Sequence, residues 1–148
     1  MQKYLFVFDF ETPAQSKNND LFEYNDKDTE MVYIKAEKEE QAFLWGRKIA
    51  EKYVREMYNN RLMPYTGAAH IEKNETQYAP EILKKVPIVL YGMHPDIESM
   101  LLKRYGKDLD EWRSIIHEKV LQTTKSNKKY YIIAAIIIAI IILFALIF

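Results

Sequence analysis

Cysteine is absent from this sequence, and glycine is scarce, with 4 residues in a chain of 148. Without cysteine there are no disulfides, thiolate metal sites or cysteine nucleophiles. The few glycines form neither a P-loop nor a G-x-G-x-x-G pattern, so a glycine-rich phosphate-binding loop is not expected. The 21 basic and 21 acidic residues leave no net charge, and we therefore expect no nucleic-acid partner. No motif predicts a cofactor.

The C-terminal segment contains only apolar and aromatic residues, from Tyr130 to Phe148. As a helix, its 19 residues would span roughly 28 Å, which is close to the thickness of a hydrocarbon core. A helix buried in a soluble core would carry a polar stripe, and this segment carries none. The sequence therefore predicts a single transmembrane helix at 130–148 and makes the lipid bilayer an expected partner.

The residues that precede this helix predict its orientation. Three lysines and two tyrosines lie at its start: Lys125, Lys128, Lys129, Tyr130 and Tyr131. Lysines gather on the cytoplasmic side of membrane helices, and tyrosines gather at the membrane–water interface. We therefore expect a cytoplasmic domain at 1–124, a basic juxtamembrane segment at 125–129 and a tail anchor at 130–148. The Ala135 and Ala139 pair also permits close helix packing, so a homo-oligomer through the membrane helix is an alternative assembly.

The hydrophobic pattern of residues 1–124 predicts an α+β fold. We expect a small antiparallel or mixed sheet of about four strands, covered by helices on one face. The expected strands are 2–10, 30–36, 69–73 and 86–91. The expected helical segments are 37–59, a turn at 80–85, a helix capped by His94 that begins at Pro95 and ends at Gly106, and a helix from Asp108 onward. Residues 11–28 are expected to form a polar loop.

The long helix at 37–59 is predicted to cover the sheet. Apolar residues fall on one half of the helix and charged residues on the other, as expected for a helix packed against a core. Gly46 lies within the apolar half, where a missing side chain would let the sheet approach closely. Leu44 is the exception, because it points outward among charged residues.

An acidic stretch follows the first strand. From Asp9 to Glu40 there are ten acidic residues and four lysines, a net charge of −6. One interpretation is a solvated loop followed by the start of a helix. The other is a patch that binds a basic protein partner, with aromatic contact from tyrosine. The residues expected to bind are Glu23, Tyr24, Asp26, Asp28 and Glu30.

An enzymatic alternative comes from Phe8-Asp9-Phe10-Glu11-Thr12 at the end of the first strand. This segment resembles the D-x-E-T first motif of the DEDD exonuclease family. The resemblance implies that Asp9 and Glu11 hold divalent metals that activate water and stabilise the leaving oxygen. The resemblance covers five residues, and no His or Tyr stands at the family's usual spacing before a last Asp. His94 and Asp96, between a strand and a helix, would assist in this alternative.

Taken together, these patterns favour a membrane-anchored protein-binding module rather than an enzyme. An immunity-type inhibitor, an adaptor and a subunit of a membrane complex all fit this description. The alternative is a metal-dependent phosphoesterase or nuclease that uses Asp9 and Glu11.

Overall fold

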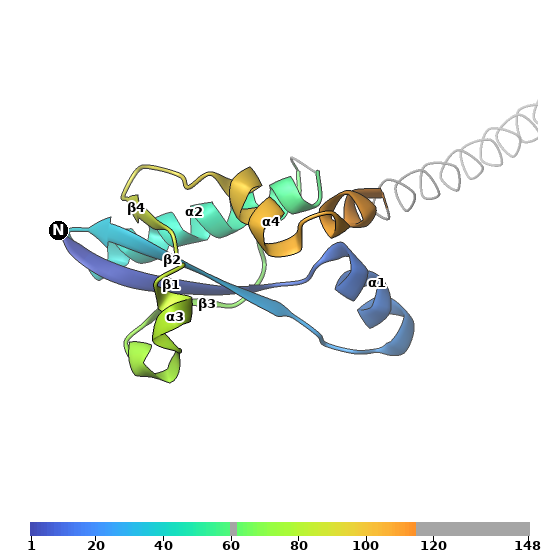
Figure 1. Ribbon diagram of the computed structural model, residues 1–148, viewed down its shortest axis with the longest axis horizontal. Coiled ribbons are helices and arrows are strands. Elements are labelled where there is room, and N and C mark those ends of the chain that lie inside the picture. The colour runs from blue at the N-terminus through green and yellow to red at the C-terminus, as the bar shows by residue number, and fades with distance from the viewer. Residues whose placement is uncertain (60–61, 115–148) are drawn as a thin grey trace, which may run out of the picture. The chain divides into compact units, whose positions relative to one another are not determined.

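Secondary structure in the computed structural model follows most of the sequence pattern over the described residues, which are 1–59 and 62–114. The strands are β1 (Gln2–Phe10), β2 (Asp28–Ala36), β3 (Ala69–Glu72) and β4 (Ile88–Leu90). The helices are α1 (Pro13–Phe22), α2 (Glu39–Met57), α3 (Pro80–Leu83) and α4 (Ile97–Tyr105), with a 3₁₀ turn, η1, at Glu75–Gln77 (Figure 1). A further helix begins at Asp108 and is described to 114. The α+β class is confirmed.

The four strands form one mixed sheet in the order β3-β1-β2-β4. β1 pairs antiparallel with β2 over its whole length, from Gln2 opposite Ala36 to Phe10 opposite Asp28. β3 is antiparallel to β1, whereas β4 is parallel to β2 and pairs only with Tyr33–Lys35. β1 is therefore a central strand, paired on both of its edges.

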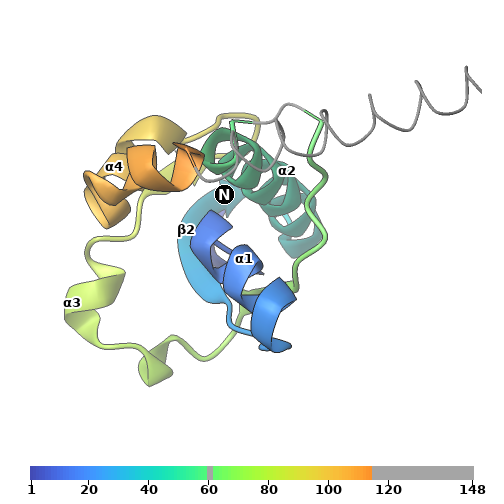
Figure 2. The ribbon, with the colours of Figure 1, turned by 90° about the vertical axis from the view of Figure 1, so that its right-hand side faces the viewer.

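α2 covers one face of the sheet, as the sequence pattern predicted (Figure 2). Phe6, Phe8 and Phe10 of β1 are buried on this face, and the rings of Phe8 and Phe10 both meet Tyr53 of α2 edge to face. Gly46 lies directly over Phe6, because a Cβ atom there would come within 2.3 Å of the Phe6 ring. The predicted role of Gly46 in the close approach of helix and sheet is confirmed.

The opposite face of the sheet is also covered, which the sequence reasoning did not predict. Leu5, Val7 and Tyr33 form a buried cluster there. Residues from the segment that includes η1 and α3 pack against it: Tyr78, Leu83 and Val86. The Tyr33 hydroxyl donates a hydrogen bond of 2.6 Å to Glu75, which ties this segment to β2. The sheet thus has the long helix α2 on one face and the short helical segments η1 and α3 on the other.

Residues 13–22 form helix α1, so the expectation of a polar loop over 11–28 was wrong for this part. Thr12 caps the helix, because its hydroxyl accepts from the Gln15 backbone N–H while the Gln15 side chain accepts from the Thr12 N–H. Pro13 suits the first position of a helix. This capping box offsets the weak helix propensity of the polar residues that follow.

α4 begins later than expected. Asp96, not His94, is the N-cap, and its carboxylate accepts from the Ser99 backbone N–H at 3.1 Å. An aspartate carboxylate accepts this bond readily, which explains the shift. Pro95 therefore precedes the cap instead of opening the helix. Gly106 ends α4 with φ 55°, as expected for a C-terminal glycine.

Within residues 1–59 and 62–114, none of the helices has both the length and the apolar character needed to cross a bilayer. The predicted anchor at 130–148, the basic segment at 125–129, the Ala135 and Ala139 pair and the domain boundary at 124 lie outside the described residues. These remain predictions.

Candidate functional site

The predicted acidic binding stretch is divided by the fold into two parts with different surroundings. Glu23, Tyr24 and Asp26 lie in the connection between α1 and β2 and are exposed. Asp28 and Glu30 lie on β2, opposite Phe10 and Phe8 of β1, and their side chains are only 29% and 14% exposed. The sequence reasoning treated all five as one surface, and the structure brings only the first three together at the surface.

Glu30 is the centre of a polar network between β2, α2 and α4. One carboxylate oxygen accepts from the Tyr53 hydroxyl at 3.1 Å and from Arg104 at 3.2 Å. The other oxygen accepts from the Met31 backbone N–H at 3.1 Å. The carboxylate therefore takes the place that a carbonyl of a neighbouring strand would take at this sheet edge.

Asp28 extends the same network toward α1 and the end of α4. It accepts from the Tyr105 hydroxyl at 2.8 Å and from the Gln15 side chain at 3.0 Å. Arg104 also approaches Asp28, at 3.9 Å. Asp28 and Glu30 thus attach α4 and α1 to the sheet, so their partners are internal.

Burial and the nearby carboxylates control the protonation of this network. Burial, followed by the charge of Glu30, raises the pKa of the Tyr53 hydroxyl. Burial and the hydrogen bond to Asp28 raise the pKa of Tyr105 in the same way. Burial works against the charge of Arg104, but the Glu30 carboxylate keeps the pKa of its guanidinium raised. Both tyrosines therefore stay neutral donors to these carboxylates.

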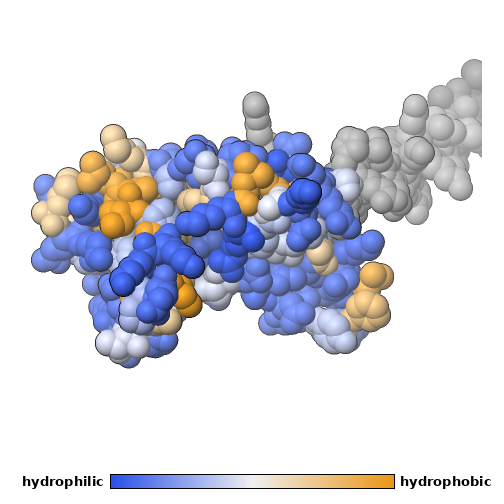
Figure 3. All heavy atoms as spheres, viewed as in Figure 1, coloured by the Kyte–Doolittle hydropathy of each residue, from blue (hydrophilic) through white to orange (hydrophobic). Residues whose placement is uncertain are grey.

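The exposed part, which we call the α1 tip (residues 19–26), combines apolar and acidic side chains. Leu21, Phe22 and Tyr24 are 65%, 62% and 61% exposed, and the rings of Phe22 and Tyr24 lie 5.8 Å apart. Glu23 and Asp26 flank them. Hydrophobic atoms gather at the end of α1 among hydrophilic ones (Figure 3). Contiguous apolar patches on a protein surface are candidate interaction sites, so this cluster is a candidate contact site.

The α1 tip is held in a defined conformation. The Asn19 side chain donates to the Asp26 carbonyl at 3.0 Å and accepts from the Asp26 N–H at 3.2 Å, which closes the turn after the helix. Glu23 ends α1 in the left-handed conformation, with φ 57°. An ordered contact surface loses less conformational entropy when a partner binds.

Leu21 and Phe22 are exposed at the end of α1 but were not among the residues predicted to bind. The polar composition of 11–28 predicted a loop, whereas Pro13–Phe22 form a helix that presents these two apolar residues at its end. The signal was present in the Thr12-Pro13-x-Gln15 sequence, which is typical of a helix start.

Asp9 and Glu11, the residues of the enzymatic alternative, line a small cavity of about 180 Å³ beside α2. The Asp9 carboxylate accepts from the Thr29 hydroxyl at 2.9 Å. The Tyr65 hydroxyl donates to the Asp9 carbonyl at 3.0 Å, and the Tyr58 hydroxyl donates to the Glu11 carbonyl at 3.0 Å. These contacts position the backbone at the end of β1.

His94 and Asp96 are not brought to this cavity. The His94 ring lies 4.8 Å from the Trp45 ring, and burial together with Lys52 and Lys48 lowers the pKa of His94. Asp96 caps α4. Across the described ranges, no three His, Asp or Glu side chains are grouped so that they would hold a metal ion. The geometry therefore gives the metal-dependent alternative no support.

Comparisons of the chain with protein-family models, with curated proteins and with solved structures found no match.

Proposed function

We propose that this chain is a membrane-anchored protein-binding module. Its folded unit would contact a basic protein through the α1 tip, and the apolar helix at 130–148 would hold it at the bilayer with the folded unit in the cytoplasm. The observation that carries the proposal is the exposed trio Leu21, Phe22 and Tyr24 beside Glu23 and Asp26.

The composition of the α1 tip supports a protein partner. A few residues, enriched in aromatic side chains, supply most of the binding energy in protein interfaces, whereas charged residues at the rim guide orientation and association rate. The α1 tip has apolar residues with acidic neighbours, so the complementary surface would be apolar with basic neighbours. Asp28 contributes to this surface indirectly, because it holds the base of α1 through Gln15.

The test is affinity purification of the full chain in mild detergent, with a tail-only chain as the background. A protein that binds the α1 tip should be enriched with the wild-type chain and lost with the Phe22→Ser/Tyr24→Ser variant. The matched control is Leu44→Ser/Leu102→Ser, which removes two side chains that are 55% and 51% exposed on other helices. Retention of the partner in the α1-tip variant, or equal loss in the control, would remove the support for this surface.

The membrane part is tested separately. The full chain should stay with membranes after alkaline carbonate extraction, and a chain that ends at residue 124 should be released. In intact cells, a tag at the N-terminus should be inaccessible from outside. Release of the full chain by carbonate would contradict the anchor without affecting the α1 tip.

The described residues bring no third carboxylate or histidine to Asp9 and Glu11, so the phosphoesterase alternative rests on the five-residue motif alone. Cleavage of nucleic acid or phosphoesters with Mg²⁺ or Mn²⁺, lost in Asp9→Ala, would restore it.

A further inference from the structure

A second feature of the folded unit is an open pocket of about 560 Å³ at the edge of β2, between α3 and α4. Its volume lies in the usual range for small-molecule sites, about 300–1,000 Å³. The side chains of Met31, Ile82, Val86, Pro87 and Met100 give the pocket an apolar lining. The pocket forms because β4 pairs with β2 only from Tyr33 onward, so the chain departs from the sheet at Pro87.

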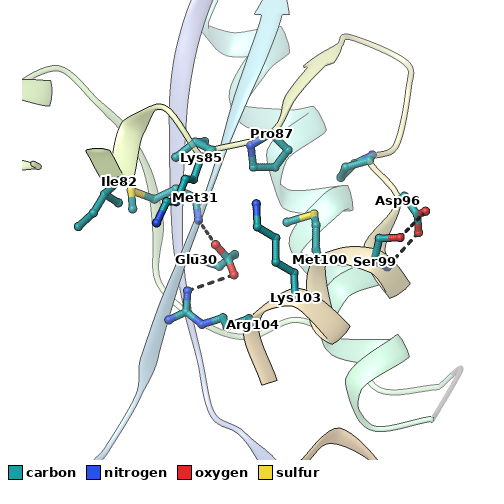
Figure 4. Close-up of a pocket in the computed structure, with 12 residues that line it drawn as sticks. Glu30, Met31, Ile82, Lys85, Pro87, Asp96, Ser99, Met100, Lys103 and Arg104 are labelled. Carbon is teal, nitrogen blue, oxygen red and sulfur yellow. Dashed lines mark hydrogen bonds and ion pairs between the residues drawn. The ribbon is translucent and has the colours of Figure 1, made fainter. Parts of the chain in front are cut away.

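The two carboxylates at this pocket already have partners. Glu30 accepts from Tyr53, Arg104 and the Met31 N–H. Asp96 accepts from the Ser99 N–H at 3.1 Å and from the Ser99 hydroxyl at 2.8 Å (Figure 4). Neither acid is therefore available as the main contact for a cationic ligand.

Two lysines at the pocket differ from these acids. Lys103 extends from α4 toward Pro87, and Lys85 comes from the end of the α3 segment on the other side (Figure 4). Within residues 1–59 and 62–114, neither ammonium group has an ion-pair partner. An apolar pocket with two unpaired cations at its walls complements a molecule that has an apolar body and an anionic head.

We propose that this pocket binds a small amphiphilic carboxylate. The carboxylate lies between Lys85 and Lys103, and the apolar body packs against Met31 and Met100. The site is separate from the α1 tip and does not depend on the proposed protein partner. Methionine is well suited to the body of such a ligand, because its flexible thioether adapts to different apolar shapes.

Binding in the pocket can be measured through the methyl signals of its two methionines, Met31 and Met100. The full chain is labelled with methyl-¹³C methionine, placed in nanodiscs of zwitterionic lipid and titrated with octanoate. Met31→Leu and Met100→Leu assign the two signals. Met57, which is fully buried in the core, and Met93, which is 60% exposed away from the pocket, serve as internal controls.

We expect saturable shifts of the Met31 and Met100 methyl signals with octanoate, without matching shifts of Met57 and Met93. Octanol and octylammonium should require at least roughly tenfold higher concentration, because they lack the charge that the lysines recognise. Equal responses to octanoate and octylammonium, or shifts spread over all methionines, would overturn the proposal.

The role of the lysines is tested with Lys85→Gln/Lys103→Gln, which should weaken octanoate binding by roughly tenfold. The matched control is Lys84→Gln/Lys107→Gln, which removes two exposed lysines that do not line the pocket. An unchanged Met57 signal in each variant shows that the core is intact. Unchanged octanoate affinity in the pocket variant would overturn the assignment.

Discussion

Two pairs of neighbouring acids, Glu23 with Asp26 and Asp28 with Glu30, have the same composition but opposite surroundings. Asp28 and Glu30 lie within a sheet and face the buried Tyr53, the half-buried Tyr105 and Arg104, whereas Glu23 and Asp26 lie in a turn among exposed apolar side chains. A buried carboxylate needs partners, because its desolvation is unfavourable unless hydrogen bonds and a cation compensate. A carboxylate in a turn remains hydrated and is free to meet a partner. Position in the sheet, not composition, separates the structural acids from the candidate binding acids.

Among the tests of this difference, Glu30→Ala should have the largest effect on stability. We expect the free energy of unfolding to fall by about 2–3 kcal/mol, because the Tyr53 hydroxyl and the Met31 N–H lose their acceptor and Arg104 loses its nearest carboxylate. Urea unfolding of the full chain in mild detergent, followed by tryptophan fluorescence, measures the change. Glu23→Ala is the matched control and should alter the free energy by less than about 0.5 kcal/mol. Similar effects of the two substitutions would contradict the division.

The next largest loss of stability is expected at alkaline pH, where the tyrosines of the network ionise. The folded protein holds Tyr53 and Tyr105 neutral with raised pKa values, so their contribution is present below the ordinary tyrosine pKa near 10 and is lost as the pH rises above it. Tyr65 adds to this effect, because burial raises its pKa to about 12.

Urea midpoints measured between pH 8 and pH 11 should therefore decline above about pH 10. The decline should be smaller in Tyr53→Phe and Tyr105→Phe, and Tyr24→Phe serves as the exposed control. A flat profile across this range would show that the network does not hold these tyrosines neutral.

A milder probe is Asp28→Ala, which removes the acceptor for Tyr105 and Gln15. We expect a loss of about 1 kcal/mol, less than for Glu30→Ala because Asp28 is more exposed and lies farther from Arg104. Protection from hydrogen exchange should fall in α4 and α1 but not in β3. Loss of protection confined to the α1 tip would place Asp28 outside the network.

The smallest effect on stability is expected for Phe22→Ser/Tyr24→Ser. Both side chains are exposed and pack mainly on each other, so the free energy of unfolding should change by less than about 0.5 kcal/mol. Denaturant unfolding of this variant beside the wild type is the measurement. A large destabilisation would mean that the α1 tip belongs to the core rather than to a contact surface.

Several elements were predictable because their signals are local. β1 has apolar residues on both faces, and α2 has a continuous apolar half in which Gly46 lies over Phe6, where a Cβ atom would come within 2.3 Å of the ring. Gly106 ends α4 as its sequence position indicated. Periodicity and glycine placement describe a residue's own strand or helix, so they can be recognised without knowledge of its neighbours.

Other elements were not predictable from these patterns. α1 has mostly polar residues and depends on the Thr12 and Gln15 capping box, a signal that hydrophobic periodicity does not detect. The cover on the second face of the sheet comes from short segments around Leu83, whose apolar residues are too few to show a period. Such segments become ordered through tertiary contacts rather than through intrinsic propensity.

The sequence by itself determined the α+β class, the strand β1, the covering helix α2 and the apolar character of 130–148. These follow from the residues' own solvation and backbone preferences. Only the tertiary structure decided which acids are structural, which aromatic residues are exposed and that Lys85 and Lys103 line the same pocket. Those properties depend on contacts such as that between Arg104 and Glu30, which are 74 positions apart in the chain.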